Sequence, residues 1–266
     1  MPAMHRARKR FGQNFLNDPA IIAKIINAID PKPNENLIEI GPGQGALTLP
    51  LLEQCHELTA IEIDRDLVAL LNGLDIENKL TIISQDVLKV NFAEFPDKLR
   101  IVGNLPYNIS TPIMLHLLKL GTKVLDMHFM LQKELVDRLA AQPGCKDYGR
   151  LSVLTQFRCK VVPLFNVAPG CFSPAPKVMS AIVRLYPKQL SDFENKLYPV
   201  LHDVAKQAFA MRRKTLKNNL KGVLTDSDYQ ELDIDPKVRA EQLTIDDFVR
   251  IATFVLNSSE RENVSS

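Results

Sequence analysis

The chain has 266 residues, of which 45% are hydrophobic and 24% are charged. This composition is ordinary for a globular protein and excludes a largely disordered chain, and the length allows a substantial core without disulfide staples. No run approaches the roughly 20 apolar residues that span a bilayer, and the first residues lack the apolar segment of a secretory signal, so we expect a cytoplasmic protein without a membrane partner.

The four cysteines are scattered and form no CxxC pair. Zinc sites and disulfide frameworks both require closer spacing than this, so we expect four reduced thiols and no metal site.

The net charge is only +2, but two separate stretches contain cations and no acid. The first, residues 1–16, carries Arg6, Arg8, Lys9 and Arg10. The second, residues 206–221, carries Lys206, Arg212, Arg213, Lys214, Lys217 and Lys221. Either stretch alone is more often a solvated surface, but two of them on a nearly neutral chain indicate a localised polyanion site.

Short β-type runs alternate with helical patterns between residues 36 and 186, which is typical of an open, mostly parallel α/β sheet. We expect strands at Leu37–Ile40, Glu57–Ile63, Leu80–Ser84, Arg100–Asn104, Val124–Leu131, Arg158–Phe165 and Met179–Leu185. We expect helices between them at Gly45–Glu53, Arg65–Asn72 and Pro112–Leu120. Only a proline-rich loop separates the last two strands, so they can form an antiparallel pair at the sheet edge.

No strand-like run remains after Pro187. The patterns there predict helices at Asp192–Phe209, Arg212–Lys221, Asp226–Leu232, Val238–Gln242 and Ile245–Asn257. We therefore expect a sheet domain over residues 1–187, a small all-helical domain over residues 188–257 and a disordered tail over residues 258–266.

The first strand of this pattern leads into a turn with glycines at positions 41, 43 and 45. Such a turn permits close approach by a ligand, but alone it is a weak signal because any strand-to-helix turn can use it. Glu62 closes the next strand, where a carboxylate can accept hydrogen bonds from both hydroxyls of a ribose. Asp86 follows the third strand, where it can accept a hydrogen bond from an adenine amino group, with Ile63 and Val87 on the two faces of the ring.

These features together suit S-adenosylmethionine, which carries no phosphate. The chain has no Walker GK[ST] sequence, so a nucleoside triphosphate is disfavoured. For Asp64 we prefer a structural role, as the N-cap of the following helix.

The fourth strand ends in Asn104-Leu105-Pro106-Tyr107, beside the strands of the expected cofactor site. The Asn104 side-chain carbonyl and a main-chain carbonyl beside Pro106 can each accept one N6 hydrogen of adenine, which directs the nitrogen lone pair toward a methyl donor. Tyr107 can stack on a base rotated out of its helix or loop. Phe172, in a loop stiffened by two prolines, is a second stacking candidate, although a core phenylalanine is an equally good interpretation.

Several segments together resemble the KsgA/RsmA family of ribosomal RNA adenine dimethyltransferases, and the resemblance covers roughly residues 8–256. They are QNFL (13–16), EIGPGQGALT (39–48), IEID (61–64), QD (85–86), NLPY (104–107), QKEL (132–135), YGRLSV (148–153), FSPAPKV (172–178) and AFAMRRKTLKNNL (208–220). The resemblance implies a Rossmann-like methyltransferase domain followed by a small helical domain. It also implies dimethylation of two adjacent adenosines in the 3′-terminal hairpin loop of 16S rRNA, with the immature 30S subunit as partner and the enzyme as a monomer.

Carried over by motif, the resemblance also assigns individual residues. The cofactor would be held by Gln13, Asn14, Leu16, Gly41, Glu62, Asp86 and Asn104, with Gly43, Ile63 and Val87 from the patterns above. The target base would be held by Asn104, Leu105, Pro106, Tyr107 and Phe172. The charge pattern assigns Arg6, Arg8, Lys9, Arg10, Arg213, Lys217 and Lys221 to the RNA, because Lys206, Arg213, Lys217 and Lys221 would share one side of a continuous helix. The family usually has an acid at the position of Met179, so a polar contact there is in doubt.

Three other functions remain open. The Erm family shares QNFL and NLPY but modifies large-subunit rRNA; YGRLSV, AFAMRRKTLKNNL and RAEQL (239–243) favour KsgA. A non-catalytic assembly factor for the 30S subunit would not need the NLPY segment or the cofactor acids, although both roles can coexist in one protein. A dinucleotide oxidoreductase leaves NLPY and both basic stretches unexplained.

Overall fold

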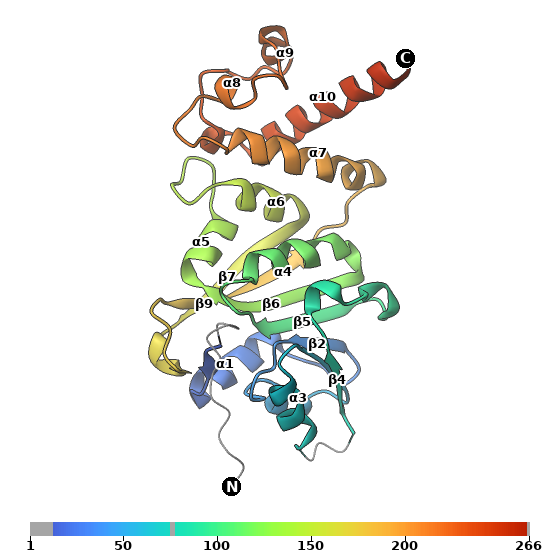
Figure 1. Ribbon diagram of the computed structural model, residues 1–266, viewed down its shortest axis with the longest axis vertical. Helices are drawn as coiled ribbons and strands as arrows, with labels where there is room; N and C mark the ends of the chain where they lie inside the picture. Colours follow the sequence, from blue (N-terminus) through green and yellow to red (C-terminus); the bar gives the residue numbers. More distant parts are fainter. Residues whose placement is uncertain (1–12, 75–77, 265–266) are drawn as a thin grey trace. The chain divides into compact units, whose positions relative to one another are not determined.

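The computed structural model describes residues 13–74 and 78–264 (Figure 1). Arg6, Arg8, Lys9 and Arg10 therefore lie outside the described residues. The chain forms two compact units: the first runs to Val136 and includes Val161–Pro187, and the second contains Asp137–Lys160 and the residues from Lys188 onward. The observed division differs from the expected one in the segment Asp137–Lys160, which belongs to the second unit.

The first unit contains a seven-stranded sheet in the order β4-β3-β2-β5-β6-β9-β7. Its strands are β2 (Asn36–Ile40), β3 (Leu58–Glu62), β4 (Leu80–Ser84), β5 (Leu99–Asn104), β6 (Val124–Gln132), β7 (Cys159–Val167) and β9 (Ser180–Pro187). The first five pair in parallel, and β9 runs antiparallel to β6. The structure thus confirms a mostly parallel α/β sheet, and all seven expected strands are present.

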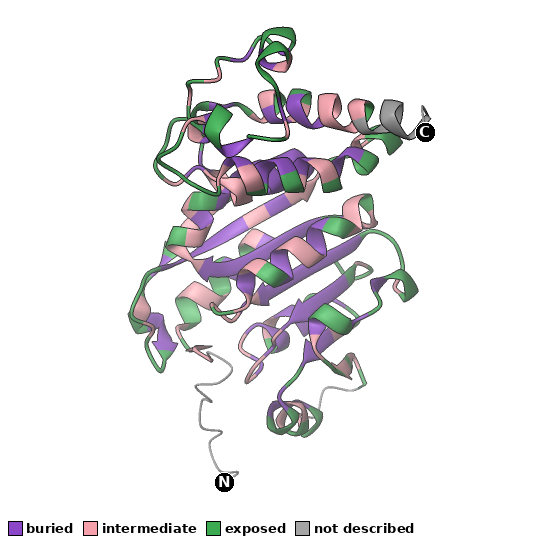
Figure 2. Ribbon diagram, turned by 45° about the horizontal axis from the view of Figure 1, so that its top comes forward, coloured by how far each residue is buried: buried purple, intermediate pink, exposed green. Residues whose placement is uncertain are grey.

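Both faces of this sheet are covered. The central strands β2, β5 and β6 are buried along almost their whole length, which Figure 2 shows as purple ribbons. Continuous burial is typical of parallel strands with helices on both sides. The helices of the first unit are α1 (Pro19–Ile29), α2 (Thr48–Leu52), α3 (Arg65–Asn72) and α4 (Ser110–Leu117), and α5 (Lys133–Ala140) ends in the second unit.

Helix α1 was absent from the sequence expectations, although its signals are present. Asp18 caps it by accepting hydrogen bonds from the N–H groups of Ala20 and Ile21, and Pro19 occupies the first turn. Isoleucines at helical spacing, including Ile25 and Ile29, are buried against the sheet. An aspartate-proline pair before such a pattern is a recognisable helix start.

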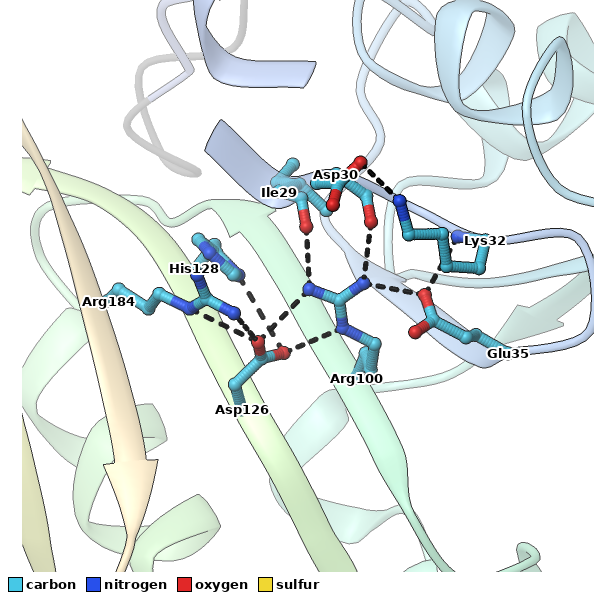
Figure 3. A network of polar contacts seen from close by, with 8 residues as sticks. All are labelled: Ile29, Asp30, Lys32, Glu35, Arg100, Asp126, His128 and Arg184. Carbon is cyan, nitrogen blue, oxygen red and sulfur yellow. Dashed lines mark hydrogen bonds and ion pairs between the residues drawn. The ribbon is translucent and has the colours of Figure 1, made fainter. Parts of the chain in front are cut away.

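A buried polar network joins the amino-terminal ends of the central strands (Figure 3). Arg100 on β5 donates to Asp126 on β6 at 2.9 and 3.0 Å, and to Glu35 at 2.5 Å. It also donates to the carbonyl of Ile29 at the end of α1, at 2.6 Å. Arg184 on β9 donates to the same Asp126 carboxylate at 2.6 Å, so one acid connects three neighbouring strands.

Burial and hydrogen bonds determine the protonation states of Asp126 and His128 in this network. Burial works to raise the pKa of Asp126, but hydrogen bonds from Arg100 and Arg184 outweigh it and hold that pKa below its ordinary value. Burial lowers the pKa of His128 to about 4, so this neighbour is neutral at physiological pH. The network therefore combines an ionised Asp126 with two guanidinium groups.

The second unit is helical, as expected. It contains α6 (Arg150–Arg158), α7 (Asp192–Ala208), α8 (Leu216–Asn219), α9 (Asp226–Glu231) and α10 (Ile245–Val264). Helix α6 packs on α7 and α10, with the ring of Phe157 stacked on Tyr198 at 6.2 Å between centroids. These contacts place Asp137–Lys160 with the helical unit, and they join residues too far apart in sequence for a local pattern to predict.

Three expectations for the second unit are wrong. The expected helix Val238–Gln242 is only a 3-10 turn at Ala240–Gln242. The expected helix Arg212–Lys221 is reduced to the four residues of α8, because Asn219 donates its amide to the carbonyls of Ala208 and Met211 at 2.7 and 3.1 Å and stabilises a chain reversal. The four cations therefore do not share one helix side. Helix α10 continues to Val264, beyond the expected end at Asn257, so residues 258–264 are helical rather than disordered.

The remaining elements are short. A two-stranded sheet pairs β1 (Phe15–Leu16) with β8 (Phe172–Ser173). Short 3-10 segments lie at Val87–Lys89, Phe92–Glu94, Leu118–Lys123, Pro169–Cys171 and Ala240–Gln242, and the segment Leu118–Lys123 is interrupted by a kink at Gly121. The four cysteines are all unpaired, and no helix in the described part of the chain is long and apolar enough to cross a membrane.

Candidate active site

A cavity of about 300 Å³ lies in the first unit, at the carboxyl ends of the central parallel strands. Most of the residues that the sequence assigns to cofactor or base line it. These are Gln13, Asn14, Leu16, Gly41, Gly43, Glu62, Ile63, Asp86, Val87, Asn104, Leu105, Pro106 and Tyr107. This is the edge where ligands bind in open α/β sheets.

The turn between β2 and α2 requires glycine for two reasons: its backbone is left-handed, and there is little room for a side chain. Without side chains there, a ligand can approach the backbone closely. Gly41 and Gly43 have φ values of 67° and 59°, which side chains other than glycine adopt at a cost. A Cβ at position 43 would lie 3.2 Å from the Phe15 ring. Gly103 on β5 pairs with Ile40, and a Cβ there would lie 2.5 Å from the Ile40 carbonyl oxygen. Glycine at position 103 thus lets β5 approach β2 and place Asn104 beside the turn.

Glu62 is a fixed acceptor at the end of β3. Its Oε1 accepts from the main-chain N–H groups of Ile63 and Asp64 at 2.8 and 2.9 Å. Its Oε2 has only a long contact of 3.4 Å with the Gly43 N–H. Burial raises the pKa of Glu62, and these N–H groups oppose that rise. One carboxylate oxygen is therefore anchored while the other can serve a ligand.

The two aspartates near the cavity both cap the helical turn that follows them, but only Asp86 is among the residues that line the cavity. Asp86 accepts from the Leu88 N–H through Oδ1 at 3.0 Å and lines the cavity. Asp64 caps α3 through the Asp66 N–H at 3.1 Å. It also accepts from the Gln13 side chain at 3.2 Å, which ties the N-terminal segment to the cavity wall.

Glu39 is a cavity residue that the sequence reasoning missed. Its side chain is almost fully buried and accepts from the Thr48 hydroxyl at 2.6 Å. Burial raises the pKa of Glu39 to about 7, and the nearby Glu62 adds to the effect. An acid within an otherwise apolar buried strand is the signal that marks it, because burying such a group is costly without a reason.

The NLPY segment is held at each of its four residues. The Asn104 amide nitrogen donates to the Asn14 carbonyl at 3.0 Å, so its Oδ1 is the atom left to accept from a ligand. The Leu105 N–H donates to the Met130 carbonyl at 3.2 Å. The Tyr107 hydroxyl lies 2.5 Å from the Ser180 hydroxyl.

The main-chain carbonyls around Pro106 are not equivalent. The Pro106 carbonyl accepts from the Ile109 N–H at 3.1 Å and from the Ser110 hydroxyl at 2.8 Å. Among the described residues, none donates to the carbonyl of Leu105. The carbonyl that can accept from a base is therefore that of Leu105.

Phe172 is the one base-site candidate that the structure separates from the cavity. Its side chain is 4% exposed, it pairs with Leu16 across the β1–β8 ladder, and it belongs to the core around α1. The expectation that the proline loop presents Phe172 to a base is therefore wrong for this conformation, and the core interpretation holds.

The charges of the cavity select the kind of ligand. Three acidic side chains line it, those of Glu39, Glu62 and Asp86, while none of the described lining residues is lysine, arginine or histidine. A phosphate would meet repulsion there, whereas a cationic nucleoside with free ribose hydroxyls would be attracted. S-adenosylmethionine, with its sulfonium and ammonium groups, fits this lining, to which Ile63, Val87 and Leu88 add apolar surface.

The chain is similar to known proteins over almost its whole length. Residues 4–256 match the profile of the ribosomal RNA adenine dimethylase family. The ribosomal RNA small subunit methyltransferase A of Legionella pneumophila (strain Lens) is 53% identical over 254 residues, which are 95% of this chain and 99% of that protein. The protein of the same name from Aromatoleum aromaticum is 52% identical over 257 residues, 97% of each.

Two solved structures are similar over most of the chain. A dimethyladenosine transferase from Plasmodium falciparum has a TM-score of 0.77 and 26% identity, covering 92% of this chain and 98% of that one. The 23S rRNA methyltransferase ErmE has a TM-score of 0.70 and 22% identity, covering 91% of this chain and 99% of that one, and shows a shared fold alone. With its profile match over nearly the whole sequence and relatives above half identity, the chain belongs to the ribosomal RNA adenine dimethylase family.

Proposed function

We propose that this enzyme uses S-adenosylmethionine to dimethylate N6 of two adjacent adenosines in the 3′-terminal hairpin loop of 16S rRNA, within the immature 30S subunit. The observation that carries the proposal is the anchored NLPY segment in the wall of an acid-lined, nucleoside-sized cavity. Relatives named small subunit methyltransferase A support the choice of subunit over the Erm alternative. The enzyme works as a monomer in the cytoplasm and contributes to small-subunit biogenesis.

Residues from each strand end would hold the cofactor. Glu62 would accept from the ribose hydroxyls, Asp86 from the adenine amino group, and Ile63 and Val87 would contact the ring faces. Gln13, Asn14, Leu16, Gly41 and Gly43 would complete the enclosure. When bound, the cofactor would supply an electrophilic methyl group and leave as a neutral thioether. N6 carries a positive charge after the transfer and is then acidic enough to release its proton to water, so the site needs no strong general base.

The NLPY segment would orient the target adenine. In the first transfer Asn104 Oδ1 and the Leu105 carbonyl would accept the two N6 hydrogens, and in the second transfer one of them would accept the hydrogen that remains. These hydrogen bonds draw the nitrogen lone pair out of conjugation and toward the methyl group. Pro106 fixes the direction of the backbone between them. Tyr107 stacks on the base, which must leave its own stack to reach the cavity.

The experiment that tests the function is mass spectrometry of rRNA from a strain that lacks the gene. We expect N6,N6-dimethyladenosine to disappear from small-subunit rRNA and to return when the purified enzyme and S-adenosylmethionine are added to the isolated subunits. Loss of the modification from large-subunit rRNA would favour the Erm reaction instead. Unchanged modification of both subunits would leave only an assembly role.

Removing the Glu62 carboxylate should weaken cofactor binding. Charge-assisted hydrogen bonds contribute about 1.5–3 kcal/mol each, so Glu62→Ala is expected to lower S-adenosylmethionine affinity at least tenfold, by roughly 1.4 kcal/mol or more, in titration calorimetry. Glu57→Ala, an exposed acid just before the same strand, is the matched control and should bind normally. Unchanged affinity in folded Glu62→Ala would remove Glu62 from the cofactor site.

The second unit offers exposed cations for the RNA backbone. Arg213, Lys217 and Lys221 are exposed, although Lys217 also forms an ion pair with Asp226 at 2.6 Å. Arg212 is held by Glu241 at 3.1 Å and by the Lys146 carbonyl, which orders the loop that carries Arg213. Arg213, Lys217 and Lys221 would therefore contact RNA phosphates, although they do not lie on one face of a continuous helix.

Replacing Arg213, Lys217 and Lys221 with alanine should weaken binding to 30S particles and flatten its salt dependence. The logarithmic slope should fall by up to about one unit for each phosphate contact that is lost. Cofactor affinity should not change, because the cavity lies in the first unit. A matched triple replacement of Lys32, Lys98 and Lys119, which includes one ion-paired lysine, should behave as wild type. The same slope for both triple variants would place the RNA elsewhere.

A further inference from the structure

The four anchors of the NLPY segment come from four different parts of the first unit. The first three anchors each involve a main-chain atom. Asn104 donates to the main-chain carbonyl of Asn14, Leu105 donates through its own N–H, and Pro106 accepts through its own carbonyl. Tyr107 differs, because its anchor joins two side chains, the phenol oxygen and the hydroxyl of Ser180, at 2.5 Å. This contact therefore depends on which amino acid occupies position 180.

Ser180 is well placed to act as a fixed point. It is the first residue of β9, its exposure is 0%, and it pairs in register with Gln132 of β6. The preceding carbonyl, that of Met179, accepts from the Lys133 N–H at 2.9 Å. The backbone around the hydroxyl is thus bound to the last residue of β6 and to the first residue of α5, and β6 is one of the most buried strands of the sheet.

Tyr107 is the partner in this pair that lines the cavity. It lies after the end of β5 and is half-buried. A tyrosine ring turns about two side-chain bonds. Because the phenol oxygen lies on the axis of the second bond, a hydrogen bond at that oxygen holds the first bond and with it the place of the ring. Burial raises the pKa of the Tyr107 phenol, so the group remains a neutral hydroxyl that can donate or accept in this pair.

We propose that Ser180 is a positioning residue that fixes the place of the Tyr107 ring in the cavity wall, and through it the adenine that stacks there. The inference rests on the proposed function, which assigns Tyr107 to the target base. Methyl transfer requires N6 to lie on the axis of the breaking bond, and small misplacements of reacting atoms reduce rates strongly. Loss of the Ser180 hydroxyl should therefore reduce turnover more than binding.

The test is a double-mutant cycle with Ser180→Ala and Tyr107→Phe, which remove the same contact from its two ends. With isolated 30S subunits as substrate, each single variant should lower kcat roughly tenfold with KM for the subunit nearly unchanged. The double variant should be no slower than the slower single variant, because only one contact is lost. Titration calorimetry should show wild-type affinity for S-adenosylmethionine in all three variants.

Ser152→Ala is the matched control for stability. Ser152 is equally buried and donates to the Arg138 carbonyl at 2.6 Å in the second unit, so this variant should lose stability without the fall in kcat. If Ser180→Ala does not fold, Tyr107→Phe alone still reports on the contact. Wild-type kcat in either folded single variant, or multiplied effects in the double variant, would overturn the inference. If the wild-type enzyme forms no dimethyladenosine, the proposed function fails instead.

Discussion

Replacing Asn104 with alanine is expected to lower turnover by roughly 100-fold or more, by analogy with the loss of one positioned polar group in other enzymes. The side chain supplies an acceptor whose orientation is set by its hydrogen bond to the Asn14 carbonyl. Without it, one N6 hydrogen of the base has no partner and the nitrogen lone pair is no longer directed. Single-turnover kinetics with isolated 30S subunits and labelled S-adenosylmethionine would measure the effect.

Two further variants make the Asn104 test specific. Asn36→Ala removes a comparable amide, which donates to the Asp97 carbonyl at 2.8 Å at the amino end of the neighbouring strand β2, and should retain turnover. Asn104→Asp keeps the size of the side chain but replaces the amide nitrogen, which donates to the Asn14 carbonyl, with an oxygen that cannot donate. The turnover of this variant should therefore also be low. Cofactor affinity can fall in both Asn104 variants, because the residue lines the cofactor cavity. Near-normal turnover in folded Asn104→Ala would refute the role.

Replacing Asp126 with alanine should be the most destabilising single change in the sheet. It would leave Arg100, whose side chain is 4% exposed, without its buried carboxylate partner. Breaking a buried ion pair from one side costs about 3–5 kcal/mol, and Arg184 loses the same partner. Urea unfolding followed by circular dichroism would show this loss as a lower midpoint.

The control for Asp126 is an exposed acid in a similar ion pair. Asp97 lies 3.5 Å from Lys123 and is 83% exposed, so Asp97→Ala should change the free energy of unfolding by less than about 1 kcal/mol. The pH dependence gives a second check. Because the pKa of Asp126 is lowered in the fold, its contribution is present above the ordinary value of 3.8 and is lost as the pH falls toward the folded pKa. An equal loss of stability in both variants would show that the network is not specially stabilising.

The sequence by itself determined the features that depend on neighbouring residues. Strand runs such as Leu80–Ser84 and helices such as Arg65–Asn72 appear in the structure with the bounds that their patterns predict. The glycine turn, Glu62, Asp86 and the NLPY segment were placed at strand ends, and parallel strands bring such ends to one edge. Periodicity, glycine content and motif spacing are local properties, so they can be found without knowing the fold.

Only the tertiary structure decided which distant residues meet. Asn14 orients Asn104 from 90 residues away, and Ser180 holds Tyr107 from 73 residues away. Asn219 bends a segment that its own periodicity predicts to be one helix, and packing against α1 buries a phenylalanine that the loop sequence leaves ambiguous. These outcomes depend on strand order and register, which bring far-separated atoms within hydrogen-bond distance and outweigh the small energies of local preference.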